Sequence, residues 1–432
     1  MKLPLEGIRV LDITGAWAGP HATMIMADWG AEVIRVESTQ FFPATTRGHL
    51  VRVPKALPRA RKGWGWSYPD WDPGEQPWNR FPIFQSHARN KLSMSVDMDR
   101  PEGLQVFHHM LAVSDVFVEN NVPETIEKLH ITYEELLKVK PDLIMLRMPA
   151  YGLNGPYKNY RSYGTHLEAT SGHTWIRGYA DMDPSLRDDV FMGDAAGGVN
   201  GAFAVLLALR HRRRTGKGQH IELSQAEAFI PYLGSTIMDY IMNARVHNAL
   251  GNRHAHMAPH GAYRCQGKDK WVTICVASDG EWRSLCEAMG SPAWCQETKF
   301  SNCLGRWRHQ DELDKRIEEW TSQCSPREVM ELLQSHGVTA CPVLDDRDLY
   351  EDPHMNAQGF FETLTHRECG THRYPGIMWT MDGVANNIRT PPCCLGENNP
   401  YVYKELLGVS PGEYARLETT GHIGTAYAST LR

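Results

Sequence analysis

The feature that most limits the fold is a change of hydrophobic period that recurs along the first 150 residues. IRVLDI (8–13) and EVIRVE (32–37) are short β-branched apolar runs, and AGPHATMIMADWG (18–30) between them places apolar residues at helical spacing. The same alternation predicts further strands at 92–98, 115–120 and 142–148. Strands that alternate with helices favour a mostly parallel sheet covered on both faces, with ligands near the carboxyl ends of the strands. We therefore expect an α/β fold.

The length predicts more than one domain. A chain of 432 residues is too long for one small core, so we expect two domains, or one domain with an insertion. The composition changes between 225 and 340, where short strands such as WVTICVAS (271–278) and small helices predict a separate smaller domain. The stretch 39–80 is irregular and rich in Pro, Trp and basic residues. Two interpretations of this stretch stay open: a ligand-binding loop, and a surface loop folded back on the core.

Charge and cysteine usage exclude several classes of protein. Lys and Arg number 45 and Asp and Glu 51, and this net charge of −6 argues against a nucleic-acid binder or a polybasic membrane protein. Without a signal-like N-terminus or a long apolar run, we expect a cytoplasmic protein. The ten cysteines lie between Cys265 and Cys394 without a CxxC pair, which favours reduced thiols. The triplet His254, His256 and His260 lacks a fourth ligand, so we expect no metal site.

A series of motifs follows in order along most of the chain. They are LPLEGIRVLDITGAWAGPHATMIMADWGAEVIRVE near the N-terminus, RNKLSMSVDM (89–98), PEGLQVFHHMLAVSDVFVENNVPETIEKL (101–129), YGLNGPY (151–157), GDAAGGVNGAFAVLLALRHRRRTGKGQHIELS (193–224), GVTACPVLDDRDLYEDPHM (337–355) and LGENN (395–399). Together they resemble the family III CoA-transferases, the group with formyl-CoA transferase, carnitine CoA-transferase and α-methylacyl-CoA racemase. The resemblance implies a Rossmann-like large domain from residues 1–224 and 341–432, an inserted smaller α+β domain at 225–340, and two interlocked subunits.

The resemblance also implies a CoA site in a cleft of the large domain. Carried over position by position, the CoA-contacting residues are Ala16, Trp17, Ser38, Asn90, Lys91, Asn120, Asn121 and Lys128. Lys91 and Lys128 offer point charges to phosphates. Ser38 departs from the family, because formyl-CoA transferase presents a basic side chain there. CoA affinity is then either weaker or supplied from the long loop, by Arg47, Arg52, Arg59, Arg61 or Lys62. CoA thioester acts as substrate, and we expect no separate cofactor.

The expected nucleophile is missing. In active relatives an Asp in a segment resembling GFDxxxQAxSG attacks the thioester and carries the acyl group as a mixed anhydride. Aligning its SG with Ser171–Gly172 in YRSYGTHLEATSGH puts Gly164 in the Asp position, or Thr165 after a shift of one residue. Neither residue can form an anhydride. Racemisation needs the same Asp and is also disfavoured.

Other groups near this gap are candidates for the chemistry. Glu168 is a carboxylate, but its position in relatives holds an apolar or small residue on the following helix. Asp194 lies at a predicted helix start, where a carboxylate more often caps the helix than reacts. His166 or His173 offers a base, although a histidine satisfied by local hydrogen bonds is the commoner outcome.

We therefore expect a CoA-transferase subunit that works with a homologous Asp-bearing subunit in an interlocked hetero-oligomer. Some family members are hetero-oligomers of this kind, and this pattern resembles the branch that acts on succinyl-CoA and (R)-benzylsuccinate in anaerobic toluene degradation. The implied architecture lets the partner's acid work in a site partly lined by this chain. Two alternatives stay open: a self-sufficient enzyme that uses a displaced carboxylate such as Glu168, and a non-catalytic CoA-binding subunit.

Overall fold

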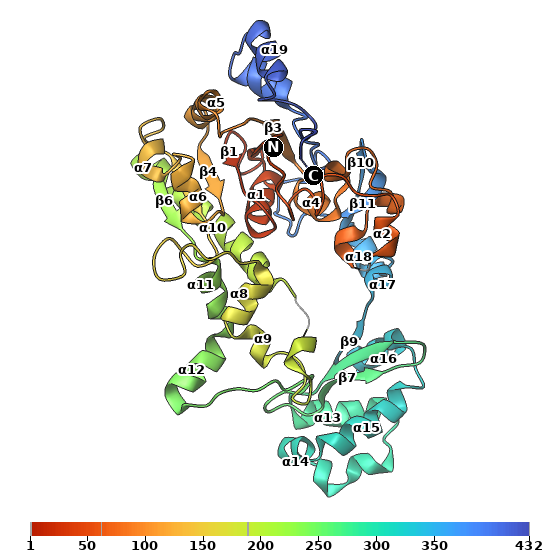
Figure 1. Ribbon diagram of the computed structural model, residues 1–432. Helices are drawn as coiled ribbons and strands as arrows, with labels where there is room; N and C mark the ends of the chain where they lie inside the picture. The colour runs from red at the N-terminus through yellow and green to blue at the C-terminus, as the bar shows by residue number, and fades with distance from the viewer. Residues whose placement is uncertain (1, 62, 188–189, 432) are drawn as a thin grey trace. The chain divides into compact units, whose positions relative to one another are not determined.

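A six-stranded parallel sheet forms the centre of the part of the fold that contains the N-terminus (Figure 1). In spatial order it comprises β3 (Lys91–Ser95), β2 (Glu32–Glu37), β1 (Arg9–Asp12), β4 (Val116–Glu119), β5 (Ile144–Arg147) and β6 (Gln219–Glu222). Each neighbouring pair is parallel, and Val10 of β1 lies opposite Val33 on one side and Val116 on the other. The strands predicted from the N-terminal alternation are all present, which confirms the α/β fold.

The chain divides into two units, each with its own core. The computed structural model describes residues 2–61, 63–187 and 190–431. Of these, the large unit comprises residues 2–171, 190–235 and 359–431, and the small unit comprises residues 172–187 and 236–358. The large unit is therefore built from both ends of the chain, as expected.

Helices cover both faces of the large unit's sheet. The helices of the large unit are α1 (Ala18–Asp28), α2 (Leu57–Ala60), α3 (Pro77–Arg80), α4 (Pro82–His87), α5 (Pro101–Ala112), α6 (Pro123–Lys128), α7 (Tyr133–Leu136), α8 (Gly164–Thr170), α10 (Met192–Thr215), α11 (Gln225–Phe229) and α19 (Pro411–Thr419). Of these, α5, α6, α7 and α19 pack on one face of the sheet, and α1 and α10 pack on the other. One buried cluster joins Phe107, Phe117 and Tyr403, and the other joins Ile25 of α1 to Val205 of α10. Burying such side chains contributes roughly 1.5–3 kcal/mol each. The C-terminal segment thus shares its core with the first strands.

Small residues let the long helix α10 lie close to α1 and to the end of β5. A Cβ on Gly198 would lie 2.9 Å from His21 Cβ, and one on Gly201 would lie 2.9 Å from Met148 Sδ. In the part of the chain that the structure describes, α10 is the one helix long and apolar enough to cross a membrane, by length and composition only. Half of its most apolar window is buried inside the protein, as in the core helix of a globular domain.

The small unit is an antiparallel sheet with its own helices. The sheet comprises β7 (His260–Arg264), β8 (Trp271–Cys275) and β9 (Thr339–Val343). Its helices are α9 (His173–Ile176), α13 (Asp279–Ala288), α14 (Cys303–Arg308), α15 (Gln310–Thr321), α16 (Pro326–Ser335), α17 (Asp346–Tyr350) and α18 (Pro353–Ala357). Tyr263, Trp282, Phe300 and Leu313 belong to its buried core. A hairpin of β10 (Phe361–His366) and β11 (Gly370–Pro375) belongs to the large unit.

The domain boundaries differ from those predicted. The small unit starts at 236 rather than 225, within α12 (Gly234–Asn243), because α11 packs against α10 in the large unit. It ends at 358 rather than 340, because β9 pairs with β8 and completes the small sheet. It also takes up the short segment 172–187, which the composition did not reveal.

Candidate active site

A cavity of about 410 Å³ opens where β1, β2 and β3 end, beside α6. We refer to it as the strand-end cavity. Three predicted CoA contacts line it: Ser38 after β2, Asn121 after β4 and Lys128 on α6. They meet because the carboxyl ends of parallel strands lie at one edge of the sheet. Sequence reasoning missed Phe41 and Asp99, which also line the cavity, although both follow strand ends.

Three other predicted contacts form or hold the loop after β1: Ala16 and Trp17 belong to this loop, and Asn120 follows β4. Asn120 accepts a hydrogen bond from the Gly15 amide at 2.8 Å and donates one to the Gly15 carbonyl at 2.9 Å. Ala16 has a φ of 57°, in the left-handed region. Trp17 stacks on Phe191 with ring centroids 5.1 Å apart. These contacts hold the loop in shape, and a role of the three residues in CoA binding stays a prediction.

Lys91 and Asn90 point into the protein rather than toward a phosphate. Lys91 Nζ is buried, donates to the Pro20 carbonyl and to Thr23 Oγ1, both at 2.8 Å, and lies 3.5 Å from Asp12 Oδ2. Burial lowers the pKa of Lys91 to about 8. The Asn90 side chain accepts hydrogen bonds from two backbone amides of the C-terminal segment, at 2.7 and 3.1 Å. The phosphate contact predicted for Lys91 is thus corrected, because its charge is used on a buried carboxylate.

A buried network of charges adjoins the strand-end cavity. Arg47 donates to both carboxylate oxygens of Glu37, at 2.7 and 2.6 Å, and Arg35 lies 3.1 Å from Asp12. Burial by itself raises the pKa of Glu37, but the guanidinium of Arg47 outweighs it and brings the pKa to about 2. Asp12 also has a lowered pKa, because Arg35 and Lys91 outweigh its burial. These carboxylates stay charged and fully paired.

The basic residues of the long loop differ in what they can offer a ligand. Arg47 is fully buried in its ion pair, so the CoA contact considered for it is excluded in this structure. Arg52 donates to a backbone carbonyl near the C-terminus at 3.0 Å. Arg59 and Arg61 are exposed, and Lys62 lies outside the described residues.

The position aligned with the missing carboxylate is Gly164, the buried first residue of α8. A Cβ built on Gly164 would lie 1.8 Å from Asp194 Oδ2. Asp194, in the first turn of α10, therefore fills the space that a side chain at 164 would need. Its carboxylate accepts hydrogen bonds from the backbone amides of Ala18 and Gly164, and burial raises its pKa to about 6. The carboxylate of Asp194 therefore occupies the space of the side chain that is missing at position 164.

Glu168 caps the neighbouring helix. Its carboxylate is fully buried and accepts the backbone amide of Met192, the first residue of α10, at 2.6 Å. Its charge is a further cause of the raised pKa of Asp194, after burial. Helix starts expose amides without helical partners, and their dipoles favour negative charge. The geometry therefore supports a capping role for Glu168 rather than the role of substitute nucleophile.

The side chains of the nearby histidine and threonine make local contacts. His166 is exposed, and its Nδ1 accepts a hydrogen bond from the Tyr163 amide at 3.3 Å. Thr165 Oγ1 lies 3.4 Å from the same ring nitrogen. His173 begins α9 in the small unit. Local hydrogen bonding of His166 is what the sequence favoured, and catalysis by either histidine stays a prediction.

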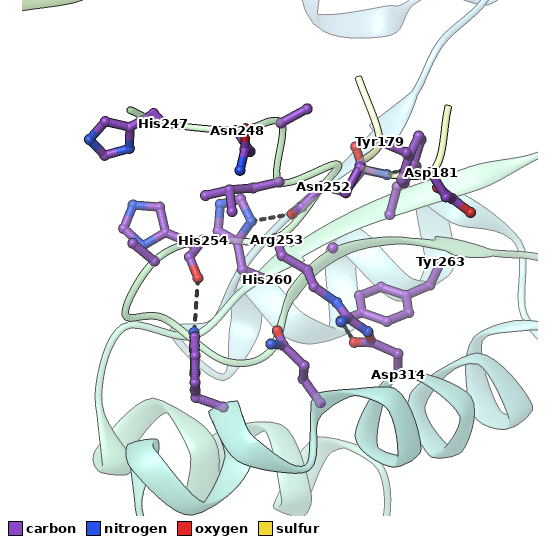
Figure 2. Close-up of a pocket in the computed structure, with 18 of the residues that line it drawn as sticks. Tyr179, Asp181, His247, Asn248, Asn252, Arg253, His254, His260, Tyr263 and Asp314 are labelled. Atoms are coloured by element: carbon purple, nitrogen blue, oxygen red, sulfur yellow. Dashed lines mark hydrogen bonds and ion pairs between the residues drawn. The ribbon is translucent and has the colours of Figure 1, made fainter. Parts of the chain in front are cut away.

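The small unit has a cavity of its own, of about 780 Å³ (Figure 2). It is lined by an irregular stretch at 245–255, by α15 and by residues 179–181. The segment 172–187 is fastened to this stretch, because Gly251 donates its amide to the Gly178 carbonyl at 2.9 Å and Asn252 donates to the Tyr179 hydroxyl at 2.7 Å. The piece of chain that joins α8 to α10 therefore forms part of the wall.

Two members of the histidine triplet, His254 and His260, line this cavity. The ring of His254 lies 4.4 Å from that of His256 and 5.3 Å from that of His260, measured between centroids. Burial, and then the two neighbouring imidazoles, lower the pKa of His254. His260 Nδ1 lies 2.6 Å from the Asn252 carbonyl oxygen. Figure 2 marks this contact with a dashed line. Among the described residues, no group of three or more His, Cys, Asp or Glu side chains is placed to hold a metal ion.

Comparisons with known proteins agree along the length of the chain. The model of CoA-transferase family III matches residues 5–399. The beta subunit of succinyl-CoA–L-malate CoA-transferase from Chloroflexus aurantiacus is 29% identical over 417 residues, which covers 94% of this chain and 95% of the relative. An alpha subunit of the transferase of that name, from the same organism, is 28% identical and covers 97% of this chain and 92% of its own length.

A solved structure shows the same fold. The crystal structure of a CaiB/BaiF family protein from Brucella suis superposes with a TM-score of 0.81 at 25% identity, over 94% of this chain and 100% of that chain. This agreement includes the parallel sheet and the separate antiparallel sheet. The expectation drawn from the motifs is confirmed: the chain belongs to CoA-transferase family III.

Proposed function

We propose that this chain is one subunit of a heteromeric, cytoplasmic CoA-transferase. It moves CoA from succinyl-CoA to a dicarboxylic acid, an aromatic succinate such as benzylsuccinate, and a homologous subunit supplies the nucleophilic Asp. The chain itself contributes a CoA cleft and part of the subunit interface.

The observation that carries this proposal is the state of position 164. Gly164 has no side chain, and a Cβ there would meet Asp194 Oδ2 at 1.8 Å. The space next to Gly164 is therefore occupied, because the Asp194 carboxylate accepts a hydrogen bond from the Gly164 amide itself. A chain whose site is adapted to the absence of that carboxylate fits a partner that performs the covalent step.

The proposed partner is supported by an exposed apolar face and by the relatives. On α10, Val199, Phe203, Leu206 and Leu207 share one face, and each is 40–57% exposed. Apolar rows of this kind on a helix mark protein–protein contacts. Two similar relatives are named as the alpha and beta subunits of one kind of CoA-transferase. A homologous chain is therefore the partner that we propose for this face.

The donor and the acceptor class are supported by the names of the relatives. They are described as acting on succinyl-CoA together with L-malate, D-citramalate or glutarate. Each of these acceptors is a dicarboxylic acid. The aromatic part of the proposal rests on the resemblance of the gapped motif around Gly164 to the benzylsuccinate branch.

Co-expression tests the division of labour. The chain is produced alone and together with an Asp-bearing homologue, and CoA transfer from succinyl-CoA is measured with benzylsuccinate, L-malate and glutarate as acceptors. We expect turnover only from the pair, and loss of turnover when the partner's Asp is changed to Asn. Full activity of the chain alone would overturn the proposal. Preference for L-malate or glutarate over benzylsuccinate would overturn the aromatic assignment only.

The second candidate is a self-sufficient enzyme that uses a displaced carboxylate. The placement of Asp194 favours Asp194 over Glu168 as that carboxylate. In that reaction a carboxylate oxygen attacks the thioester carbonyl, the C–S bond breaks, CoA leaves as thiolate, and a mixed anhydride remains. Asp194 lies where a side chain at position 164 would begin and keeps 7% of its surface exposed, whereas Glu168 is fully buried.

Trapping distinguishes the two candidates. Hydroxylamine converts an acyl anhydride or a thioester on a carboxylate into a hydroxamate, which is located by peptide mass spectrometry after incubation of the chain alone with succinyl-CoA. The second candidate predicts a hydroxamate on Asp194, absent in Asp194→Asn and retained in the matched control Glu168→Gln. The first candidate predicts no hydroxamate on this chain.

A further inference from the structure

The walls of the strand-end cavity are largely apolar. Ile13, Val36, Val96 and Leu129 line it, together with Phe41, whose side chain is 66% exposed. An exposed aromatic ring beside apolar walls suits a planar heterocycle, because bases stack on aromatic faces. The volume of about 410 Å³ lies in the range of small-molecule sites and suits a nucleoside rather than a whole CoA molecule.

The buried charges at this cavity are already neutralised. The Arg35 side chain is 3% exposed and lies 3.1 Å from Asp12. Glu37 is held by Arg47 at 2.6 Å. Turning Arg35 outward to a phosphate would leave a buried carboxylate without its partner, which is costly in a low-dielectric interior. The buried pairs therefore give a phosphate no cation.

The rim of the cavity carries one unpaired negative charge. Asp97 is buried and already paired with Arg100 at 2.8 Å. Asp99 is exposed and forms no ion pair with the residues that the structure describes. The cation of the rim is Lys128, which is 73% exposed and lies 2.7 Å from Glu124. An exposed ammonium that already has a carboxylate neighbour attracts a further anion weakly, because water and salt screen it.

Beside these charges, Ser38 presents a hydroxyl at the end of β2. Its Oγ accepts the Gln40 amide at 3.1 Å and carries no charge. The Ser38 hydroxyl and the Asp99 carboxylate can accept hydrogen bonds from an amino group or from ribose hydroxyls. The Asp99 carboxylate also repels a phosphate, so the lining suits a neutral ligand rich in donors.

We propose that the strand-end cavity binds the neutral adenosine part of a CoA ligand and draws little affinity from its 3′-phosphate, and that Ser38 and Asp99 determine this preference. The proposal rests on the proposed function only in taking CoA as the ligand. It names a chemical class: adenine nucleotides, with or without a phosphate on the ribose 3′-oxygen. Stacking on Phe41 and hydrogen bonds to neutral donors supply the affinity.

Calorimetry with matched ligands tests this preference. CoA and 3′-dephospho-CoA are titrated into the purified chain, and we expect their dissociation constants to agree within about threefold. A phosphate held by a direct charged hydrogen bond would instead favour CoA by about tenfold or more. Wild-type chain that prefers CoA by that margin, or that binds neither ligand, would overturn the proposal.

Two variants examine the residues named. Ser38→Arg places a guanidinium at the end of β2 and should tighten CoA binding by about tenfold while 3′-dephospho-CoA changes little. Asp99→Asn should act in the same direction by about threefold. The matched control Phe41→Ala should weaken both ligands equally. Equal effects of Ser38→Arg on the two ligands, in a variant whose circular dichroism is unchanged, would contradict the assignment.

The proposed ligand preference and the proposed transfer function can be contradicted independently. Titration uses neither an acceptor acid nor the Asp-bearing partner, so loss of the proposed transfer activity leaves the ratio of the two dissociation constants unaffected. Conversely, an active heteromer whose Ser38→Arg variant shows no change in selectivity would retain the proposed function and remove this inference.

Discussion

Two groups of buried carboxylates in the large unit differ in what surrounds them. Glu37, beside the strand-end cavity, is held by the guanidinium of Arg47 at 2.6 Å, and its pKa falls to about 2. Asp194, at the start of α10, is held by backbone amides, and burial raises its pKa to about 6. Both are buried in the same unit, yet one stays charged at every physiological pH and the other titrates close to neutrality.

The difference separates structural from reactive candidates. A carboxylate that is fully ion-paired resists both protonation and movement, so Glu37 acts as a fixed part of the fold. A carboxylate whose pKa is raised by burial can change its protonation state near neutral pH, which is typical of functional sites. Asp194 belongs to the second class.

The largest expected effect comes from breaking the ion-paired group. Arg47→Met leaves Glu37 buried without its cation, and we expect the free energy of unfolding to fall by about 3–5 kcal/mol. Denaturant unfolding monitored by circular dichroism measures it. The double variant Arg47→Met with Glu37→Gln removes both charges and should regain much of the loss. A single variant within about 1 kcal/mol of wild type would show that the network does not stabilise the fold.

The pH dependence of the free energy of unfolding tests the second kind of carboxylate, represented by Asp194. The pKa of Asp194 is 3.8 ordinarily and about 6 in the folded chain, so the folded state binds the proton more tightly. This contribution is complete below about pH 4 and is lost as the pH rises through about 6. Over the whole titration, from well below pH 4 to well above pH 6, wild type should lose about 3 kcal/mol relative to Asp194→Asn. Unfolding curves of the two proteins across this range test it, and parallel profiles would contradict the raised pKa.

A side chain at position 164 should cost less, but the cost should depend on Asp194. Gly164→Ala places a Cβ 1.8 Å from Asp194 Oδ2, and we expect a loss of about 1–3 kcal/mol. Asp194→Gly in the same chain should relieve the clash. The matched control is Gly412→Ala in α19, where a Cβ meets nothing within 4 Å and alanine should be neutral or slightly stabilising. Similar effects at both glycines would remove the steric argument.

The same geometry predicts which variant could restore a nucleophile at position 164. Gly164→Asp alone should give an unstable and inactive chain, because Asp194 occupies its space. Gly164→Asp with Asp194→Gly is the variant that gives a new carboxylate room, and CoA transfer by the isolated chain is the readout. Activity in the single variant but not in the double one would contradict the view that Asp194 closes the site.

The parts of the fold that could be predicted are those fixed by local sequence. The period change near the N-terminus located the first strands within a few residues, because a buried parallel strand needs only a short β-branched run. The domain boundary at 340 was wrong because β9 completes its sheet by pairing with β8, whose partner residues lie 60 or more positions earlier. Pairing at that distance leaves no local signal.

At the candidate site, the residue types could be predicted but their directions could not. Ser38, Asn121 and Lys128 follow strand ends, and the topology alone brings them to one cavity. Lys91 lies on an edge strand in the same sheet, but its side chain turns toward Asp12, which is 79 residues away. The gap at Gly164 was visible in the sequence, whereas its filling by Asp194 depends on how α8 meets α10.

The smallest expected effect concerns the coupling of the two carboxylates at the helix starts. Glu168→Gln removes a charge that raises the pKa of Asp194, while the remaining amide oxygen can still accept the Met192 backbone amide. Burial is the larger cause of the shift and is unchanged, so the pKa of Asp194 should fall but stay above 3.8. The midpoint is obtained by comparing Glu168→Gln with Glu168→Gln/Asp194→Asn across pH, as for the wild-type pair. An unmoved midpoint would show that the charge of Glu168 does not affect the pKa of Asp194. A midpoint at the ordinary value of 3.8 would show that repulsion by Glu168, and not burial, raises the pKa of Asp194.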